Sequence, residues 1–280
     1  MVISADVLRS YRSIDEKTVD ELLAQEIKNN NKKIVVLDDD PTGVQTVHDI
    51  SVYTGWDADS LREAFAEGNN LFYILTNSRG FTKEQTKTAH LEIADAVDRA
   101  AKEASRDYIF ISRSDSTLRG HYPLETRLLK ECYERNTGVK LDGEILCPFF
   151  KEGGRYTIGD VHYVKYGDEL VPAHETEFAK DKTFGYTAEN LPDYVEEKTA
   201  GEYKAKDVIS ISLEDIRSMD FDKIESQLMS AKNFNKIIVN AIDYSDIKVF
   251  AVALFRAMNA GKMFMFRTAA ALVKVMGGVS

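Results

Sequence analysis

Three consecutive aspartates, Asp38, Asp39 and Asp40, follow a short apolar run and precede Pro41-Thr42-Gly43. Adjacent carboxylates repel one another, so three of them are unusual in a structural turn unless a cation, an arginine or a donor-rich ligand offsets their charge. Because Asp, Pro, Thr and Gly are also common turn residues, an ordinary turn is the alternative interpretation. If a cation or a ligand offsets their charge, these carboxylates are candidate acid–base or ligand-binding groups.

Two further polar loops follow apolar runs. One holds Ser78 and Arg79, and the other, at 112–120, has Arg113 and Arg119 on either side of Asp115 and Ser116. An arginine fork can bind a carboxylate through two N–H groups, and aspartate and serine can bind sugar hydroxyls. Each loop alone could be a solvated turn with an internal ion pair. Three such loops after three strands favour a site for a small, anionic, hydroxylated ligand.

The same aspartates also fit a competing motif. Asp38 and Asp40, with Thr42, match the Asp-x-Asp-x-Thr nucleophile motif of haloacid-dehalogenase-type phosphatases. That mechanism needs a later lysine and an acidic pair after another strand to hold Mg²⁺. The candidate around Asp160 lacks the second carboxylate, and the apolar run 237–239 ends in Asn240 rather than in acids. A magnesium-dependent phosphatase built on Asp38 and Asp40 therefore stays as an alternative.

The segments around these loops are typical of a parallel α/β fold. Short runs rich in Val, Ile, Phe and Tyr predict strands at 34–37, 50–53, 71–75, 108–111, 145–147, 208–211, 236–239 and 263–266. Amphipathic or capped stretches predict helices at 15–30, 58–67, 82–105, 123–135, 188–199, 221–231 and 245–260, and one starting near Arg267. This alternation predicts a three-layer α/β/α fold with a mostly parallel sheet, in which ligands bind beyond the carboxyl ends of the strands.

One segment departs from this rhythm. Residues 156–171 alternate apolar and polar side chains around Gly159-Asp160 and Gly167-Asp168. That pattern predicts a β-hairpin or an extended arm, inserted in the domain at about 151–185. We expect residues 1–280 to form one ligand-binding domain that contains this insertion.

Composition excludes several classes of partner. The net charge is −10, from 36 basic and 46 acidic residues, which disfavours binding to nucleic acid. No apolar run reaches the length of a membrane span. Only Cys132 and Cys147 occur, so a disulfide framework and a paired-cysteine metal site are both absent from the sequence. We therefore expect a cytoplasmic protein that contacts neither nucleic acid nor membrane and holds no structural metal.

Five motifs, in order from about Ile34 to the end of the chain, resemble the four-carbon acid sugar kinase family. They are Asp39-Asp40-x-Thr42-Gly43; Asp115-Ser116-Thr117-Leu118-Arg119-Gly120; the stretch 148–157 with Gly159-Asp160-Val161-His162; Glu175-Thr176-Glu177-Phe178-Ala179-Lys180-Asp181; and Arg267-Thr268-Ala269-Ala270. The chain departs from the family at Arg113-Ser114, where a lysine and an apolar residue or threonine are common. It also departs at Asp38 and Pro41.

The resemblance implies the amino-terminal domain of a two-domain enzyme that transfers the γ-phosphoryl group of ATP to the terminal hydroxyl of a tetronate or oxo-tetronate. On this hypothesis Asp39 and Asp40 are the catalytic carboxylates. The acid's carboxylate goes to Arg79 and Arg119, with Arg113 or Arg155 as further candidates, while Asp115, Ser116 and Ser78 hold hydroxyls.

The nucleotide-binding domain is expected to be absent from this chain. The sequence contains no GxxxxGK[ST] motif, and it stops just after Arg267-Thr268-Ala269-Ala270, where that domain would begin. The resemblance implies that ATP and Mg²⁺ serve the complete enzyme, and we expect neither to bind tightly to this chain alone. A non-catalytic acid-sugar-binding module is a further alternative, and a homodimer is left open.

Overall fold

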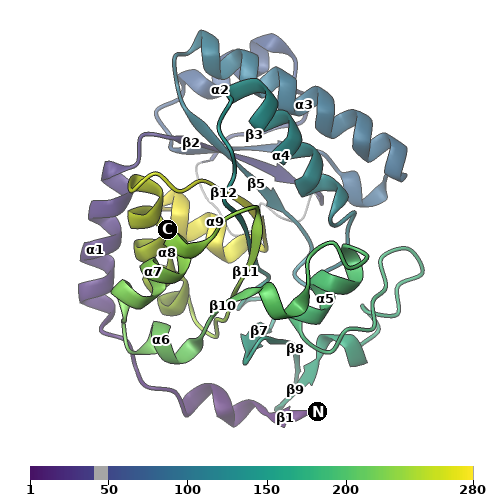
Figure 1. Cartoon of the computed structure of the whole chain (residues 1–280), viewed down its shortest axis with the longest axis vertical. Coiled ribbons are helices and arrows are strands. Elements are labelled where there is room, and N and C mark those ends of the chain that lie inside the picture. The colour runs from purple at the N-terminus through teal and green to yellow at the C-terminus, as the bar shows by residue number, and fades with distance from the viewer. Residues whose placement is uncertain (41–49, 280) are drawn as a thin grey trace.

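The computed structural model describes residues 1–40 and 50–279 (Figure 1). The predicted turn residues Pro41, Thr42 and Gly43 lie outside the described residues. Within the residues that are described, a large sheet of eight strands runs in the order β10-β11-β6-β12-β5-β2-β4-β3, and each of its pairings is parallel. The strands are β2 (Lys33–Asp38), β3 (Val52–Tyr53), β4 (Leu71–Leu75), β5 (Tyr108–Arg113), β6 (Gly143–Cys147), β10 (Ile209–Ile211), β11 (Asn235–Val239) and β12 (Phe264–Thr268).

Apolar runs became strands because this sheet is covered on both faces. Every residue of β2, β5, β6 and β12 is buried, which explains why their sequences are mostly apolar rather than alternating, with polar residues chiefly toward the strand ends. Lys33 is an exception at the start of β2. Its ammonium group donates to the carbonyls of Glu67 (3.1 Å) and Asn69 (2.6 Å), which satisfies the charge where it is buried.

Two helical layers cover the sheet. One consists of α2 (Ala58–Ala66), α3 (Lys83–Glu103) and α4 (Leu124–Thr137); the other consists of α1 (Glu16–Asn29), α6 (Leu213–Arg217), α7 (Phe221–Ser230), α8 (Tyr244–Asn259) and α9 (Ala270–Gly277). The crossovers through α3 and α4 step along the sheet toward β10, whereas those through α7 and α8 step toward β3. Right-handed crossovers in opposite directions place their helices on opposite faces. The three-layer α/β/α prediction is confirmed.

The predicted hairpin or arm is part of a second, antiparallel sheet. Its strands are β1 (Ile3–Ser4), β9 (Glu169–Pro172), β8 (Val161–Tyr166) and β7 (Arg155–Ile158), in that order. Gly159 and Asp160, at φ +54° and +64°, make the two-residue turn between β7 and β8, as a type I′ hairpin requires. The small sheet lies below β10 and β11 in Figure 1, beside α5 (Leu191–Lys198). The insertion is therefore a docked sheet rather than a free arm.

Several boundaries differ from the prediction. Arg267 does not start a helix, because it is the fourth residue of β12, where the strand pairs with both β5 and β6; the helix starts at Ala270. The predicted strand 50–53 is reduced to the two residues of β3. Neither β1 nor α6 was predicted, since each is too short to show a period. Among the described residues, no helix is both long and apolar enough to cross a bilayer.

Candidate functional site

The predicted polar loops meet at the carboxyl edge of the large sheet. β5, β2 and β4 are neighbours, so the residues that follow them start side by side. The backbone N–H of Asp39 donates to the carbonyl of Arg113 (3.3 Å), and the N–H of Arg79 donates to the carbonyl of Asp39 (3.2 Å). Backbone hydrogen bonds therefore join the three loops.

Arg79 lies at the centre of this edge. Its Nη2 and Nε donate to the two carboxylate oxygens of Asp39 at 2.7 and 3.2 Å, and its Nη1 donates to Oδ2 of Asp40 at 2.5 Å. Oδ1 of Asp115 lies 4.0 Å away. Burial alone would lower the pKa of Arg79, but Asp39, Asp115 and Asp40 raise it overall. Three carboxylates thus surround one permanently charged guanidinium group.

Asp38 has a separate partner. Its side chain has no exposed surface, and its Oδ1 accepts from Nη1 of Arg113 at 2.8 Å. Burial raises the pKa of Asp38, while Arg113 opposes that shift. The expectation that cations offset the three aspartates is confirmed, by Arg113 for Asp38 and by Arg79 for the other two. A phosphatase nucleophile must reach its substrate, so the burial of Asp38 gives that alternative no support.

Asp39 and Asp40 differ in exposure. The side chain of Asp39 is 4% exposed and that of Asp40 is 23% exposed. Burial raises the pKa of Asp39 to about 7 despite the opposing effect of Arg79, and the nearby carboxylate of Glu125 adds to the rise. Asp40 is therefore the carboxylate that a ligand can reach, while Asp39 mainly holds the guanidinium group of Arg79.

Glu125 belongs to this cluster, and sequence reasoning missed it. It lies in the first turn of α4 and is 1% exposed, and its Oε1 accepts from the hydroxyl of Ser78 at 2.8 Å. Ser78 is itself completely buried, so its hydroxyl serves Glu125 in this structure. Gly120, at φ +121°, lies close to both Asp39 and Glu125: a Cβ atom there would lie 3.4 Å from Asp39 Oδ2 and 3.6 Å from Glu125 Oε2. Glu125 stands in an ordinary helical pattern, so no spacing signal could have found it.

Arg267 is the second residue whose role was missed, although its motif was noted. From β12, between β5 and β6, its Nη2 donates to the carbonyls of Leu118 (3.2 Å) and Arg119 (3.3 Å). Its guanidinium carbon lies 4.7 Å from the ring centroid of Tyr122. Arg267 therefore fastens the backbone of the loop 112–120 to the middle of the sheet.

The loop itself is ordered by Asp115. Its Oδ2 accepts from Nε of Arg119 at 2.7 Å and also from the hydroxyl of Thr117. Burial would raise the pKa of Asp115, but the hydrogen bonds from Arg119 and Thr117 and the charge of Arg79 lower it overall, so Asp115 is ionised. Ser116 is half-buried beside it. The carbonyl of Ser116 accepts from Nε2 of His162, in the small sheet, at 2.7 Å.

Arg155 completes the set of predicted residues. It starts β7, on the small sheet, and its guanidinium carbon lies 5.3 Å from the ring centroid of Phe178. The guanidinium carbon of Arg119 lies 5.1 Å from the same centroid. The structure thus brings Asp39, Asp40, Arg79, Asp115, Arg119 and Arg155 into one continuous network and leaves Ser78 and Arg113 buried behind it.

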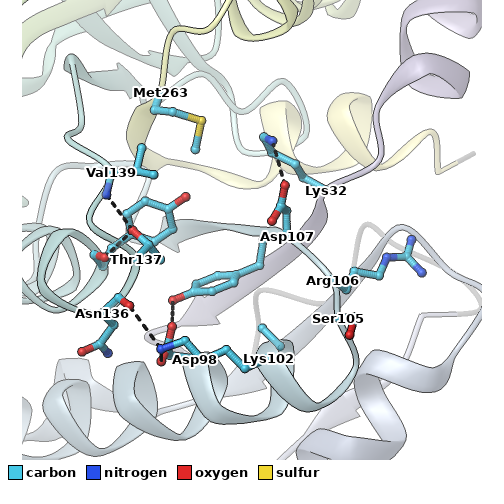
Figure 2. Close-up of a pocket in the computed structure, with 13 residues that line it drawn as sticks. Lys32, Asp98, Lys102, Ser105, Arg106, Asp107, Asn136, Thr137, Val139 and Met263 are labelled. Carbon is cyan, nitrogen blue, oxygen red and sulfur yellow. Dashed lines mark hydrogen bonds and ion pairs between the residues drawn. The ribbon is translucent and has the colours of Figure 1, made fainter.

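A pocket of about 410 Å³ opens at the opposite edge of the sheet, where α3 and α4 end and β2 and β5 start (Figure 2). Figure 2 shows its charged groups facing one another: Lys32 lies 3.6 Å from Asp107, and Lys102 lies 2.7 Å from Asp98. Ligands of open parallel sheets bind at the carboxyl ends of the strands, not at this edge. We therefore assign the candidate site to the carboxyl edge.

A pocket of about 600 Å³ lies beyond the loop after β5, lined in part by Lys83, Gly120 and Lys198. The cavity directly beside Asp115 is much smaller. A cavity of about 10 Å³, the size of one water molecule, is lined by Ser114, Asp115, Leu118, Leu146, Pro148, Arg267 and Thr268. In the ranges 1–40 and 50–279, no group of three or more His, Cys, Asp or Glu side chains is arranged to hold a metal ion.

This fold and this edge define an α/β domain with a polar site at its strand ends. The sequence profile of a family described as a sugar-binding N-terminal domain matches residues 34–276. The chain therefore belongs to this family, which confirms the family expected from its motifs, the amino-terminal domain of the four-carbon acid sugar kinases. No curated protein is significantly similar in sequence.

Solved structures share the fold. A Bordetella bronchiseptica protein with a domain of unknown function, described as a domain-swapped dimer with bound citrate, is 18% identical with a TM-score of 0.61 over 87% of this chain. A Haemophilus influenzae protein of the same domain family is 17% identical (TM-score 0.54, 87%). A Salmonella typhimurium LT2 protein described as a candidate tRNA synthase is 13% identical (TM-score 0.56, 89%). This chain spans 55% of the length of each.

Proposed function

We propose that this chain is the substrate-binding domain of an ATP-dependent kinase that phosphorylates the terminal hydroxyl of a four-carbon sugar acid, a tetronate or an oxo-tetronate. The observation that carries the proposal is the arrangement around Arg79, where Asp39, Asp40 and Asp115 surround one guanidinium group at the carboxyl edge. Such an edge is where α/β domains hold small ligands. The carboxylates accept hydrogen bonds from hydroxyl groups, which suits a polyhydroxylated substrate.

Phosphoryl transfer requires an acceptor hydroxyl that is held in line and can lose its proton. Asp40 is the more exposed of the two carboxylates on Arg79, so it orients the hydroxyl and takes its proton. Asp39 holds Arg79 through two hydrogen bonds and thereby fixes the position of Asp40. Asp115 and Ser116, on the neighbouring loop, bind the remaining hydroxyls.

The nucleotide is assigned to another part of the enzyme. Because the sequence has no glycine-rich phosphate-binding motif, ATP and Mg²⁺ would be held mainly outside this chain, and the carboxylates described above would face them across the acceptor hydroxyl. The citrate in the Bordetella bronchiseptica protein supports a small carboxylate as ligand, and its dimeric state supports self-association as a proposal. A binding module without catalysis is the second candidate, and the citrate in the Bordetella bronchiseptica protein suits it equally well.

Thermal denaturation of this chain with candidate ligands tests the binding half of the proposal. L-threonate and D-erythronate at about 100 times Kd should stabilise the fold by about 2.7 kcal/mol, raising Tm by several degrees. We expect no shift with ATP and Mg²⁺. If neither these acids nor their oxidised forms raise Tm, the proposed substrate class is wrong. Magnesium-dependent release of phosphate from p-nitrophenyl phosphate, lost on Asp38→Asn, would favour the phosphatase.

A further inference from the structure

The site contains two stacked arginines on one aromatic ring. Arg119, from the loop after β5, and Arg155, from the small sheet, lie 5.1 and 5.3 Å from the ring centroid of Phe178. Each guanidinium group carries a permanent charge, and two cations against one ring repel one another. An anion, or a carboxylate of the protein, that lies close to both groups offsets this repulsion.

The protein supplies only part of that counter-charge. Arg119 is paired with Asp115 at 2.7 Å, whereas no carboxylate of the described residues lies within 4.0 Å of the guanidinium group of Arg155. Nη1 of Arg155 donates to the carbonyl of Gly153, and its buried Nε has no partner in the described structure. Burial lowers the pKa of Arg155 and the charge of Arg119 adds to that shift, while the charges of Asp115 and Glu177 oppose it. Arg155 is therefore a cation that lacks a full set of acceptors.

The other arginines of the site have their carboxylates or carbonyls already. Arg79 holds both Asp39 and Asp40, and Arg113 is buried against Asp38. Arg267 donates to two backbone carbonyls and is 3% exposed. Of the arginines predicted to bind the acid, Arg155 has no carboxylate within 4.0 Å among the described residues, and the guanidinium group of Arg119 holds Asp115 through Nε alone. These two can therefore accept an anion while they keep the contacts they have.

Local chain geometry holds Arg155 in this position. Phe150 and Arg155 exchange two backbone hydrogen bonds, of 3.1 and 2.9 Å, which close a tight turn. A Cβ atom on Gly153 within that turn would lie 2.6 Å from the ring of Phe150, so only glycine fits there. The turn therefore presents Arg155 to Phe178 with little freedom, as a preorganised binding group requires.

We propose that Arg119, Arg155 and Phe178 form a carboxylate clamp that binds the acid group of the ligand and sets its orientation. This inference rests on the proposed function, and it replaces Arg79 by Arg155 as the partner of Arg119. The site then has a positive end at the clamp and a negative end at Asp39 and Asp40, joined by Asp115. A sugar acid binds with its carboxylate at the first end and its terminal hydroxyl at the second, and the reversed orientation places carboxylate against carboxylate.

The Arg155→Met variant tests the clamp. Methionine keeps an unbranched apolar stem on Phe178 and removes the charge. Calorimetric titration with L-threonate or D-erythronate should show Kd raised at least 10-fold relative to the wild type. Binding of the uncharged amide of the same acid should change less than 2-fold. Arg62→Met, on exposed α2, makes the same change of charge far from the site and should leave both affinities unchanged.

A second variant distinguishes a loss of binding from a loss of folding. Phe178→Leu keeps the charges and removes the ring, and it should weaken acid binding several-fold while the unfolding midpoint of the protein stays close to that of the wild type. Equal affinity of Arg155→Met and wild type for the acid would overturn the clamp and leave the proposed function standing. Equal loss for acid and amide would overturn it too, because the effect would then not depend on the carboxylate. Failure of the wild type to bind any acid would instead count against the proposed function.

Discussion

Asp39 and Asp40 are adjacent in the sequence and share one guanidinium group, yet their environments separate their roles. The buried Asp39 makes the two-pronged contact with Arg79, and the more exposed Asp40 makes a single contact. A carboxylate that must meet a substrate hydroxyl has to remain accessible, and one that must fix an arginine does not. The difference in exposure therefore assigns the proton acceptor to Asp40.

Replacing Asp40 by asparagine tests that assignment in an enzyme that contains this domain together with its nucleotide site. Asparagine keeps the shape and a hydrogen-bonding oxygen but cannot accept the proton, so kcat should fall about 100-fold or more. Circular dichroism should show an unfolding midpoint within a few degrees of the wild type. Asp59→Asn, which changes an exposed aspartate of α2 in the same way, should leave kcat unchanged. Turnover at the wild-type rate in Asp40→Asn would remove Asp40 from the mechanism.

At the scale of elements, the small sheet is fixed to the candidate site by its own turn and strand residues. The carboxylate of Asp160 accepts from Ser210 in β10 (2.5 Å) and from Asn240, the residue that follows β11 (2.7 Å). Two residues later, His162 donates from Nε2 to the carbonyl of Ser116 and accepts at Nδ1 from the hydroxyl of Thr157 (2.9 Å). A carbonyl can only accept, so Nε2 carries a proton, and burial lowers the pKa of the ring so that it is neutral and Nδ1 accepts from Thr157. The Gly-Asp-Val-His motif therefore attaches the small sheet to the large sheet and to the loop 112–120.

Burial lowers the pKa of His162 from 6.5 to about 4, which makes the stability of the protein sensitive to acid. In the unfolded chain this residue takes up a proton below about pH 6.5, and in the folded protein only near pH 4. Its contribution to stability is therefore present above pH 6.5 and is lost as the pH falls toward 4. Urea unfolding at pH 7 and pH 4.5 should show a loss of about 2 to 3 kcal/mol that depends on this residue.

Two substitutions at His162 test separately its hydrogen bond to Ser116 and its protonation. The side-chain amide of His162→Gln can donate to the carbonyl of Ser116 as Nε2 does, so this variant should bind the ligand as tightly as the wild type. Because glutamine does not titrate, the variant should also lose the drop in stability between pH 7 and pH 4.5 that His162 causes. His162→Asn is too short to reach the carbonyl, so its affinity should fall. If both variants bind the acid as tightly as the wild type, His162 does not position the loop.

At the scale of elements, the sequence predicted features that a local motif marks, and it missed contacts between residues far apart in the chain. The polar ends of β2, β4 and β5 were predictable because turn residues follow runs that only a buried strand explains. Glu125 meets Ser78 across 47 residues of chain, and Arg267 meets Leu118 across 149. Contacts of this range leave no local period or spacing. The two-residue strand β1 likewise exists only because β9 pairs with it.

Across the whole molecule, a buried ion pair ties the large sheet to the chain that enters α4. Lys236 of β11 lies 2.6 Å from Glu144 of β6, and the hydroxyl of Tyr122 donates to the same oxygen at 3.0 Å. The ammonium group also lies 3.9 and 4.1 Å from the ring centroids of Phe234 and Tyr203. Both charged side chains are at most 2% exposed, so each depends on the other for its charge.

Lys236→Met should therefore destabilise the protein strongly, because it leaves the buried carboxylate of Glu144 uncompensated. The expected loss in urea unfolding is about 3 to 5 kcal/mol. Adding Glu144→Gln to that variant should recover part of the loss, since the second charge is then also removed. Lys248→Met breaks a more exposed pair with Asp20 and should cost less than about 1 kcal/mol. A loss in Lys236→Met no larger than in Lys248→Met would show that the buried pair contributes little.

The strand order of the large sheet has a consequence for protein synthesis. β12 is the last strand among the residues that the structure describes, yet it lies between β5 and β6, near the middle of the sheet. Until residue 268 has left the ribosome, β5 and β6 both keep an open edge of unpaired backbone groups. Such edges attract other chains, and parallel sheets with distant partners assemble slowly. During translation the centre of the sheet therefore stays unpaired until β12 has emerged and inserted between β5 and β6.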